Sequence, residues 1–288
     1  MATGDPVTGH VGRGAVEVTA RRGEEAARSL REDEALRVNP GGSLHSIDAK
    51  LDQFSMVLPV ARGLIGHWEF ESQTDGVTPD SSGNGHSGRL EGNAAIVSDA
   101  ERGKVLALSG LRSSGDGVNI DAIREIPTLL PHRGATLAAW IKRNPDSSAG
   151  YEHGYIVALG ASGDAPIMTL GVSKDSRRPM GFIEGDGDAD QAHVSGDTGL
   201  LDGEWTHLAV TYDRAANQAI TYLNGVAQAT PADISAVGDG ALDWQGATIG
   251  RNPDHLERDD RFFGGRIDDV RIYDRVLSTA EIRALVSE

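Results

Sequence analysis

Two stretches decide the fold of this chain: GHWEFESQTDGVTPDSSGNGHSG, residues 66–88, and GGRIDDVRIYDRVLSTAEIRAL, residues 264–285. In the first, Trp68 and Phe70 share one face of an extended segment while polar neighbours take the other, as a half-buried β-strand requires. The second pairs a similar alternation with a helical pattern over 279–286. The two stretches predict the opening and closing strands of one large β-domain.

The region between these stretches has the same character. Asn224-Gly225 lies between two apolar runs and predicts a type I′ hairpin, because both residues tolerate positive φ. Many strands separated by turns, with almost no helix, predict two packed antiparallel sheets. The other alternating segments are 135–141, 155–159, 168–172, 205–212, 219–223 and 268–273.

Five motifs occur in a fixed order: TLAAWIKR, DGEWTHLAVTYD, YLNG, ATIGRN and the closing IDDVRIYDR. With them, residues 64–288 resemble a laminin-G-like domain of the concanavalin A-like lectin/glucanase superfamily. The resemblance implies an all-β jelly-roll β-sandwich of two antiparallel sheets. It also implies recognition rather than catalysis, with carbohydrate as the expected ligand.

The first 58 residues form a separate β-rich module, joined to the sandwich by a linker at 59–63. Short apolar bursts between turn signals predict β-hairpins here. The segment is similar to the C-terminal part of the FecR domain, although Glu32-Asp33-Glu34 stands where that family tends to have Gly. The resemblance implies a bacterial envelope protein in an extracytoplasmic location, the periplasm or cell surface. A plain β-rich spacer is the alternative.

Composition narrows the possible partners. The 288 residues carry a net charge of −16, which repels phosphate backbones and disfavours nucleic acid as a partner. No apolar stretch approaches the roughly 20 residues of a membrane helix, so we expect no membrane insertion by this chain. The first residues lack the pattern of a signal peptide, and we expect upstream sequence to be missing. The absence of cysteine excludes disulfides and thiolate catalysis.

The loop DSSGNGHSG, residues 80–88, is rich in oxygen donors, which calcium prefers. Asp80 and Asn84 could supply ligands for a structural Ca²⁺. The resemblance implies that an acidic residue of the closing strand completes the site. Strand alternation places Asp268 and Asp269 on opposite faces, and we choose Asp268. The alternative is an Asx-type turn in which Asp80 accepts hydrogen bonds from backbone amides.

The densest acidic cluster is EGDGDAD, residues 184–190. An EF-hand is excluded because Gln191 stands at the sixth loop position counted from Asp186, where glycine is required. The paired carboxylates of a lectin-like glucanase are also missing, because Ala189 occupies the second acidic position. We therefore expect a solvated loop, with a ligand site or a second calcium site as alternatives.

The four tryptophans divide into two groups. Trp68, Trp140 and Trp205 lie in strands at positions that resemble the family core, and we expect them to be buried. Trp244 lies outside a clear strand and is the candidate for stacking on a sugar. Loop placement and side-chain chemistry give the set of expected ligand contacts: Tyr151, His153, Asp186, Asp188, Trp244 and Arg251.

The sequence therefore predicts a non-catalytic recognition module that binds a glycan or a protein surface. Two other functions stay open. One is a structural or adhesive spacer that binds no sugar. The other is a glycoside hydrolase, which the superfamily includes but for which we identify no catalytic residue.

Overall fold

The computed structural model divides the chain into two compact units, Met1–Val57 and Leu58–Glu288. In the first unit it describes the backbone of five strands. In the second it describes residues 61–120, 134–145, 153–160, 167–173, 176–184, 191–228, 230–237, 246–253 and 261–288.

The smaller unit contains two antiparallel arrangements. One is a three-stranded sheet in the order β1-β4-β5, and the other is the hairpin β2-β3. The apolar bursts of the sequence fall within β2 to β5. The strands are β1 (Val7–His10), β2 (Val16–Val18), β3 (Arg28–Leu30), β4 (Glu34–Val38) and β5 (Leu44–Asp48).

The first sheet of the larger unit has nine strands. Its order is β19-β18-β17-β12-β22-β10-β9, with β20 paired to β18 and β6 paired to β22. Its strands are β6 (Leu64–Trp68), β9 (Ala95–Asp99), β10 (Gly103–Ser109), β12 (Ala135–Arg143), β17 (Trp205–Asp213), β18 (Gln218–Leu223), β19 (Val226–Ala227), β20 (Ala232–Asp233) and β22 (Gly264–Tyr273).

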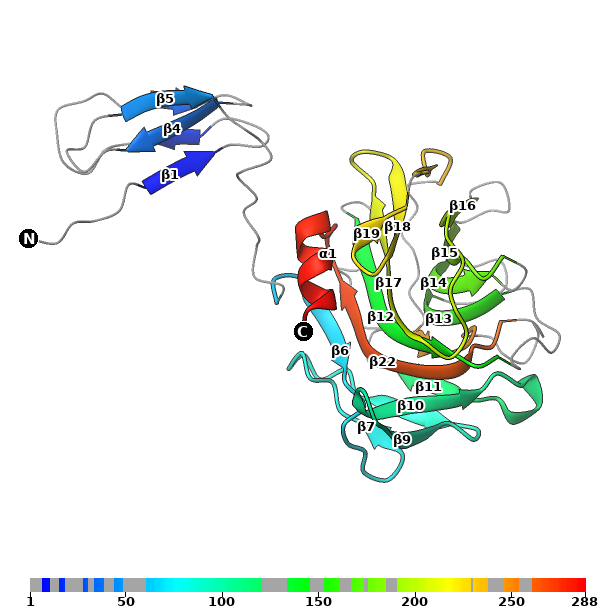
Figure 1. Ribbon diagram of the computed structural model, residues 1–288. Coiled ribbons are helices and arrows are strands. Elements are labelled where there is room, and N and C mark those ends of the chain that lie inside the picture. The colour runs from blue at the N-terminus through cyan, green and yellow to red at the C-terminus, as the bar shows by residue number, and fades with distance from the viewer. Residues whose placement is uncertain are drawn as a thin grey trace, which may run out of the picture. The chain divides into compact units, whose positions relative to one another are not determined.

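The second sheet has eight strands in the order β16-β15-β14-β13-β21-β11-β8-β7. The two antiparallel sheets confirm the predicted jelly-roll sandwich (Figure 1). The strands are β7 (Val77–Thr78), β8 (Gly88–Glu91), β11 (Gly117–Ile120), β13 (His153–Gly160), β14 (Ile167–Ser173), β15 (Pro179–Glu184), β16 (Gln191–Ser195) and β21 (Ala247–Ile249); a short 3-10 helix, η2 (Arg112–Ser114), precedes β11.

The apolar core fills the space between the two sheets, and one tyrosine crosses it. Tyr212 of β17 is fully buried, and its hydroxyl lies 2.7 Å from the carbonyl oxygen of Thr169 and 3.2 Å from that of Phe182, both in the opposite sheet. Gly181 makes room for this contact, since a Cβ there would lie 2.5 Å from the hydroxyl oxygen. Tyr212 therefore joins the sheets by a hydrogen bond as well as by packing.

We expect Tyr212→Phe to lower the free energy of unfolding by about 1–2 kcal/mol, because it leaves buried carbonyl groups without their donor. Urea unfolding measures the change. Tyr222→Phe is the matched control, since Tyr222 is also buried but makes no such hydrogen bond across the core. Equal losses in the two variants would show that the hydroxyl of Tyr212 contributes nothing specific.

Two local predictions are confirmed. Asn224 and Gly225 have φ of 47° and 75° and connect β18 to β19, as a type I′ turn requires. The helix α1 (Thr279–Val286) begins at the N-cap Ser278, which forms a reciprocal capping box with Glu281.

Helix α1 covers part of the outer face of the nine-stranded sheet. Ile282 and Leu285 pack there with Tyr222 and Tyr273 in a small second apolar cluster. No helix of the described residues combines the length and apolar character that a membrane span needs. The rest of this outer face, beyond α1, carries polar and aromatic side chains.

Candidate functional site

A β-bulge in β22 brings two adjacent carboxylates to the same face of the nine-stranded sheet. Ile267 and Val270 both point into the core, so Asp268 and Asp269 both lie on the outer face. The register with β12 shifts at this point, and Asp269 adopts a φ of 52°. A bulge inserts one extra residue and interrupts the alternation of side chains. The expectation that the two aspartates lie on opposite faces is therefore wrong.

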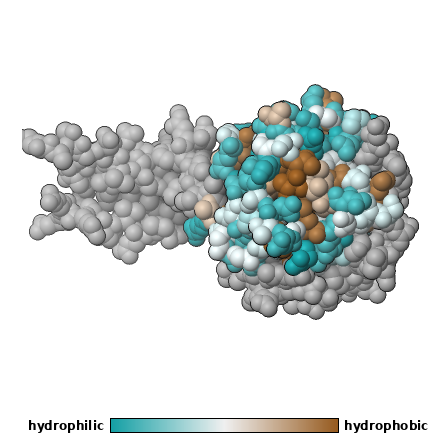
Figure 2. Space-filling view, turned by 90° about the horizontal axis from the view of Figure 1, so that it is seen from below, coloured by the Kyte–Doolittle hydropathy of each residue, from teal (hydrophilic) through white to brown (hydrophobic). Residues whose placement is uncertain are grey.

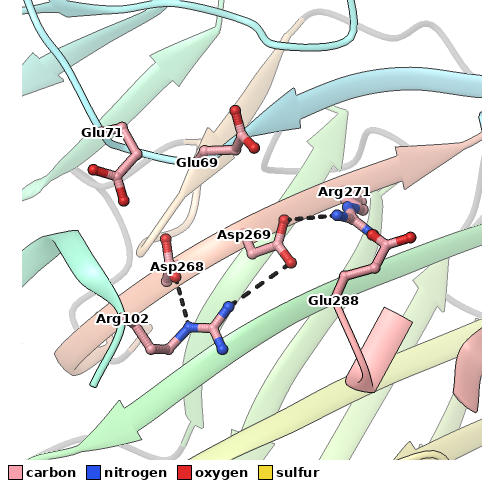
Figure 3. A pocket seen from close by; sticks show the side chains of 7 residues that line it. All are labelled: Glu69, Glu71, Arg102, Asp268, Asp269, Arg271 and Glu288. Carbon is pink, nitrogen blue, oxygen red and sulfur yellow. Dashed lines mark hydrogen bonds and ion pairs between the residues drawn. The ribbon is translucent and has the colours of Figure 1, made fainter. Parts of the chain in front are cut away.

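These aspartates line a cavity of about 290 Å³ on the outer face. Five carboxylates and two guanidinium groups surround it, from segments far apart in the sequence (Figure 3). The lining residues are Glu69 and Glu71 after β6, Arg102 between β9 and β10, Asp268, Asp269 and Arg271 in β22, and Glu288 after α1.

The two guanidinium groups are engaged by the inner carboxylates. Arg102 Nε donates to Asp268 Oδ2 at 2.6 Å, and its Nη2 lies 3.9 Å from Asp269 Oδ2. Arg271 bridges Asp269 Oδ1 at 3.1 Å and Glu288 Oε2 at 2.5 Å. His67 Nε2 also contacts Asp269. Asp269 thus has three side-chain partners, whereas Asp268 has one, Arg102, together with a hydrogen bond from the backbone amide of Asp269.

This difference drives the pKa values of the two aspartates apart. Burial raises the pKa of Asp268 to about 6, and Arg102 offsets only part of that effect. Burial acts in the same direction on Asp269, but the hydrogen bond to His67 and the charge of Arg271 outweigh it and hold its pKa below the usual value. Neighbouring carboxylates of the same bulge therefore titrate in different ranges of pH.

Two tryptophans lie beside the cavity on the same face. In the β12–β17 ladder, Trp140 is paired with His207, and Trp205 is paired with Lys142. The residues that alternate with the two tryptophans along each strand point into the core, so both tryptophans lie on the outer face. Both indole rings are partly exposed. The expectation that Trp140 and Trp205 are buried core residues is wrong, because they occupy the outer face. Trp68 is fully buried, as expected.

Arg102 connects the tryptophans to the cavity. Its Cζ lies 4.4 Å from the ring centroid of Trp140 and 5.6 Å from that of Trp205, within the range of cation–π contacts. His207 is paired with Trp140 in the β12–β17 ladder. Their rings meet edge to face, with the ring centroids 5.5 Å apart. Burial lowers the pKa of His207 to about 4, so it is neutral at pH 7. Trp140 Nε1 and His207 Nδ1 are both buried without a hydrogen-bond partner.

The residues predicted to bind calcium are engaged in other interactions. The carboxylate of Asp80 accepts hydrogen bonds from the amides of His67, Ser82 and His86 and from the Ser82 hydroxyl, at 2.8–3.0 Å. This is the arrangement of an Asx-type turn. The Asn84 amide group donates to the carbonyls of residues 64 and 65.

Asp80, Asn84 and Asp268 do not fit a shared calcium site in this geometry. The carboxylate of Asp80 already accepts four hydrogen bonds, and Asp268 is paired with Arg102. Within the described ranges, no group of three acidic or histidine side chains is arranged to hold a metal ion. The hydrogen bonds and ion pairs of these three residues therefore favour the Asx-type turn over a calcium ion.

Two of the other predicted ligand residues, His153 and Arg251, belong to the eight-stranded side of the sandwich. His153 is the first residue of β13. Arg251 follows β21, is 2% exposed, donates to the carbonyl of Gly115 at 2.8 Å and contacts Glu91. Arg251 therefore connects the end of β8 to the turn before β11 and does not lie on the surface. Tyr151, Asp186, Asp188 and Trp244 lie outside the described residues.

Comparison with known proteins adds the family. The sequence signature of the concanavalin A-like lectin/glucanases superfamily matches residues 112–283, well over half of the chain. The chain belongs to this superfamily. The match does not include the first unit, so the FecR-like resemblance stays a prediction. No curated protein matches the chain in sequence.

Solved structures of other proteins resemble the sandwich. Domain 4 of AbnA, a GH43 extracellular arabinanase from Geobacillus stearothermophilus solved with arabinotriose, has a TM-score of 0.53 at 21% identity and covers 77% of this chain and 98% of its own. The receptor binding domain of botulinum neurotoxin mosaic serotype C/D has a TM-score of 0.60 at 16% identity, with coverages of 80% and 51%. The chain spans about half the length of that domain. At these identities the likeness shows the fold.

Sequence reasoning missed most residues of this superfamily member's cavity. Arg102, Arg271 and Glu288 carry no motif that marks them as a site. The signal for Trp140 was present, because it shares strand parity with Lys142 and opposes the parity of Leu137 and Ile141. Parity along β12 therefore identifies the tryptophan as an outer-face residue.

Proposed function

We propose that the larger unit is a non-catalytic recognition module that binds glycans at the outer face of the nine-stranded sheet. The observation that carries the proposal is the position of Arg102. It lies between two partly exposed tryptophans and two carboxylates at the edge of a cavity.

The chemistry of this face suits a sugar. Hydroxyl groups both donate and accept hydrogen bonds, and the cavity offers carboxylate acceptors together with guanidinium donors. The exposed parts of Trp140 and Trp205 offer apolar surface for the carbon-bearing face of a ring. Most of these groups stand on paired strands, which hold them more precisely than loops do.

The arrangement of the two inner carboxylates, Asp268 and Asp269, favours binding over hydrolysis by this pair. A glycosidase needs two carboxyl groups on either side of the scissile bond, one as acid and one as nucleophile or base. Asp268 and Asp269 are adjacent residues on one bulge and approach Arg102 together. Asp269 is further neutralised by Arg271, which weakens it as a nucleophile.

The structural relatives support a recognition role. The AbnA domain was solved with arabinotriose, and the neurotoxin domain is a receptor binding domain. A location outside the cytoplasm is part of this proposal and rests on the FecR-like resemblance of the first unit. Calcium is not part of the proposed site.

A glycan array followed by calorimetry on the full chain tests the proposal. We expect Arg102→Met to weaken glycan binding by about tenfold or more, because it removes the guanidinium that lies over Trp140 and donates charge-assisted hydrogen bonds, but keeps an unbranched side chain at that position. Asp75→Asn is the control, since Asp75 is an exposed turn carboxylate with φ of 52°, which Asn also tolerates.

Three outcomes would contradict the proposal. Absence of binding across the array, with capture of a protein partner, would favour the spacer. Equal glycan affinity of Arg102→Met and the parent chain would move the site elsewhere. Release of reducing sugar would make the protein a hydrolase.

A further inference from the structure

The cavity beside Arg102 carries more negative than positive charge. Its lining has five carboxylates and two guanidinium groups, which leaves an excess of three negative charges when all are ionised. The net charge of −16 on the whole chain adds a field of the same sign. The site therefore attracts a cationic ligand and repels an anionic one.

Two of the five carboxylates are open to a ligand charge. Glu69 and Glu71 follow β6, both are exposed, and neither makes an ion pair with a described residue. The other three lining carboxylates are already paired with guanidinium groups. In the view of Figure 3, Glu69 and Glu71 lie on one side of Asp268 and Asp269, and Arg102 lies on the other. The open carboxylates thus form a separate wall of the cavity.

The charge of one paired carboxylate is also incompletely compensated. Asp268 is 4% exposed, and burial raises its pKa to about 6 although Arg102 donates to it at 2.6 Å. The adjacent charge of Asp269 acts in the same direction as burial. A further positive charge beside Asp268 would favour its ionised form. The buried end of the cavity therefore favours the same ligand charge as the exposed glutamates.

Two ring nitrogens next to the cavity suit hydroxyl groups of a ligand. His207 is 2% exposed, and its Nδ1 has no hydrogen-bond partner among the described residues. The charges of Asp269, Arg271 and Arg102 act on this ring, which places it close to the cavity. Trp140 Nε1 is likewise a buried donor without a partner. Buried polar atoms of proteins usually have a partner, and a sugar hydroxyl could supply it here.

The positions of these groups set the length of the ligand. Trp140 lies on β12, Glu69 follows β6, and both strands pair with β22. Two interstrand steps therefore separate them, or about 10 Å. Trp205 on β17 lies one step further. A single small cation cannot contact both the glutamates and the tryptophans, whereas a short oligosaccharide can.

The surface on the side of β7 and β9 has a mixed character. Figure 2 shows the described surface from this side, with hydrophobic residues near its middle and hydrophilic residues around them. A saccharide has polar hydroxyl groups around apolar ring faces. Such a surface therefore suits a saccharide better than a wholly apolar ligand.

We propose that the glycan bound at this site is an oligosaccharide with free amino groups, whose ammonium groups bind Glu69 and Glu71 while its rings lie along Trp140 and Trp205. Hydrogen bonds between ammonium and carboxylate are charge-assisted and stronger than those between neutral groups. N-acetylation of the sugar removes this charge, and a uronic acid reverses it. The inference rests on the proposed function and names the ligand class of the same site.

Calorimetry of the full chain with three tetrasaccharides tests the inference: the tetramers of glucosamine, N-acetylglucosamine and galacturonic acid, in a buffer that keeps the amine protonated. We expect the glucosamine tetramer to bind about tenfold or more tightly than the N-acetylated tetramer, and the galacturonic acid tetramer to bind most weakly. Raising the NaCl concentration from about 50 to about 500 mM should weaken the first interaction and leave the second nearly unchanged.

The double variant Glu69→Gln/Glu71→Gln should lower the affinity for the glucosamine tetramer about tenfold or more and leave the affinity for the N-acetylated tetramer unchanged. The fold should tolerate both changes, because both side chains are exposed. Glutamine at position 71 can also accept the hydrogen bond that Glu71 Oε1 accepts from the Lys104 amide at 3.3 Å.

The matched control is Asp213→Asn/Asp233→Asn, which removes the same number of charges. Asp213 ends β17, at the opposite end of the strand from Trp205, and both aspartates pair with Gln218. The control should bind the glucosamine tetramer as the parent chain does. This comparison separates loss of a local contact from a change in net charge.

Two results would overturn the inference and leave the glycan site in place. One is equal affinity of the parent chain for the glucosamine and N-acetylated tetramers. The other is unchanged affinity of the double variant for the glucosamine tetramer. Tighter binding of a tetralysine peptide than of the glucosamine tetramer would overturn the inference in favour of a basic protein partner. If no glycan of any charge binds, the proposed function fails as well.

Discussion

Asp80→Ala is expected to lower the free energy of unfolding by about 3 kcal/mol or more, and the melting temperature by roughly 6–12 °C. The carboxylate of Asp80 accepts four hydrogen bonds, three of them from backbone amides that have no other acceptor described. These bonds outweigh burial and hold the pKa of Asp80 below its usual value. Its stabilising contribution is therefore present above pH 3.8 and lost as the pH falls through the lower folded pKa.

Thermal unfolding with calcium and with excess EDTA separates the turn from an ion site. We expect the same melting temperature in both buffers, because Asp80, Asn84 and Asp268 do not form a shared donor set. Asp75→Asn should change little, since that carboxylate is exposed and accepts no such bonds. If calcium raises the melting temperature of the parent chain but not that of Asp80→Ala, the calcium site is supported and the plain turn is contradicted.

Asp268→Asn is expected to stabilise the protein at pH 7 by up to about 3 kcal/mol, since a pKa of about 6 in place of 3.8 corresponds to about 2 pH units. The folded state holds the proton of Asp268 more tightly than the unfolded state does. Stability from this group is therefore lost as the pH rises from about 4 to about 6. Asparagine removes the buried charge and can still accept a hydrogen bond from Arg102.

Denaturant unfolding at pH 4 and pH 7 measures this effect, with Asp269→Asn as the neighbouring comparison. Because the pKa of Asp269 is lowered, its stabilising effect is present above pH 3.8 and lost in acid. Asp269→Asn should therefore destabilise the protein at pH 7. Destabilisation by Asp268→Asn at pH 7 would mean that its ion pair with Arg102 outweighs the cost of burial.

The sequence predicted the sandwich because its strands carry strong local signals. The apolar parity of segments such as 135–141 and 205–212 locates β12 and β17, and Asn-Gly and Ser278 mark the ends of other elements. Parity also shows which side chains share a face. Leu208 and Val210 of β17 point into the core, so parity also places Trp205 on the outer face, and assigning it to the core by family position was wrong.

The candidate site was harder to predict because it depends on long-range geometry. The bulge at Asp269 reverses strand parity, and its trace in the sequence is the spacing of three between Ile267 and Val270. Arg102 meets Asp268 across 166 positions of sequence. Such a pairing follows from the strand order of the sheet, which local patterns do not specify.

That strand order also has a consequence for how the polypeptide is synthesised. β22 lies in the middle of its sheet, between β12 on one side and β6 and β10 on the other, yet it follows every other strand of that sheet in the sequence. Until residues 264–273 leave the ribosome, β12 and β10 present unpaired edges in the nascent chain. Closure must wait for contacts between segments about 200 residues apart, such as Arg271 with His67. We therefore expect slow, late closure of this sheet and a nascent chain that depends on chaperones.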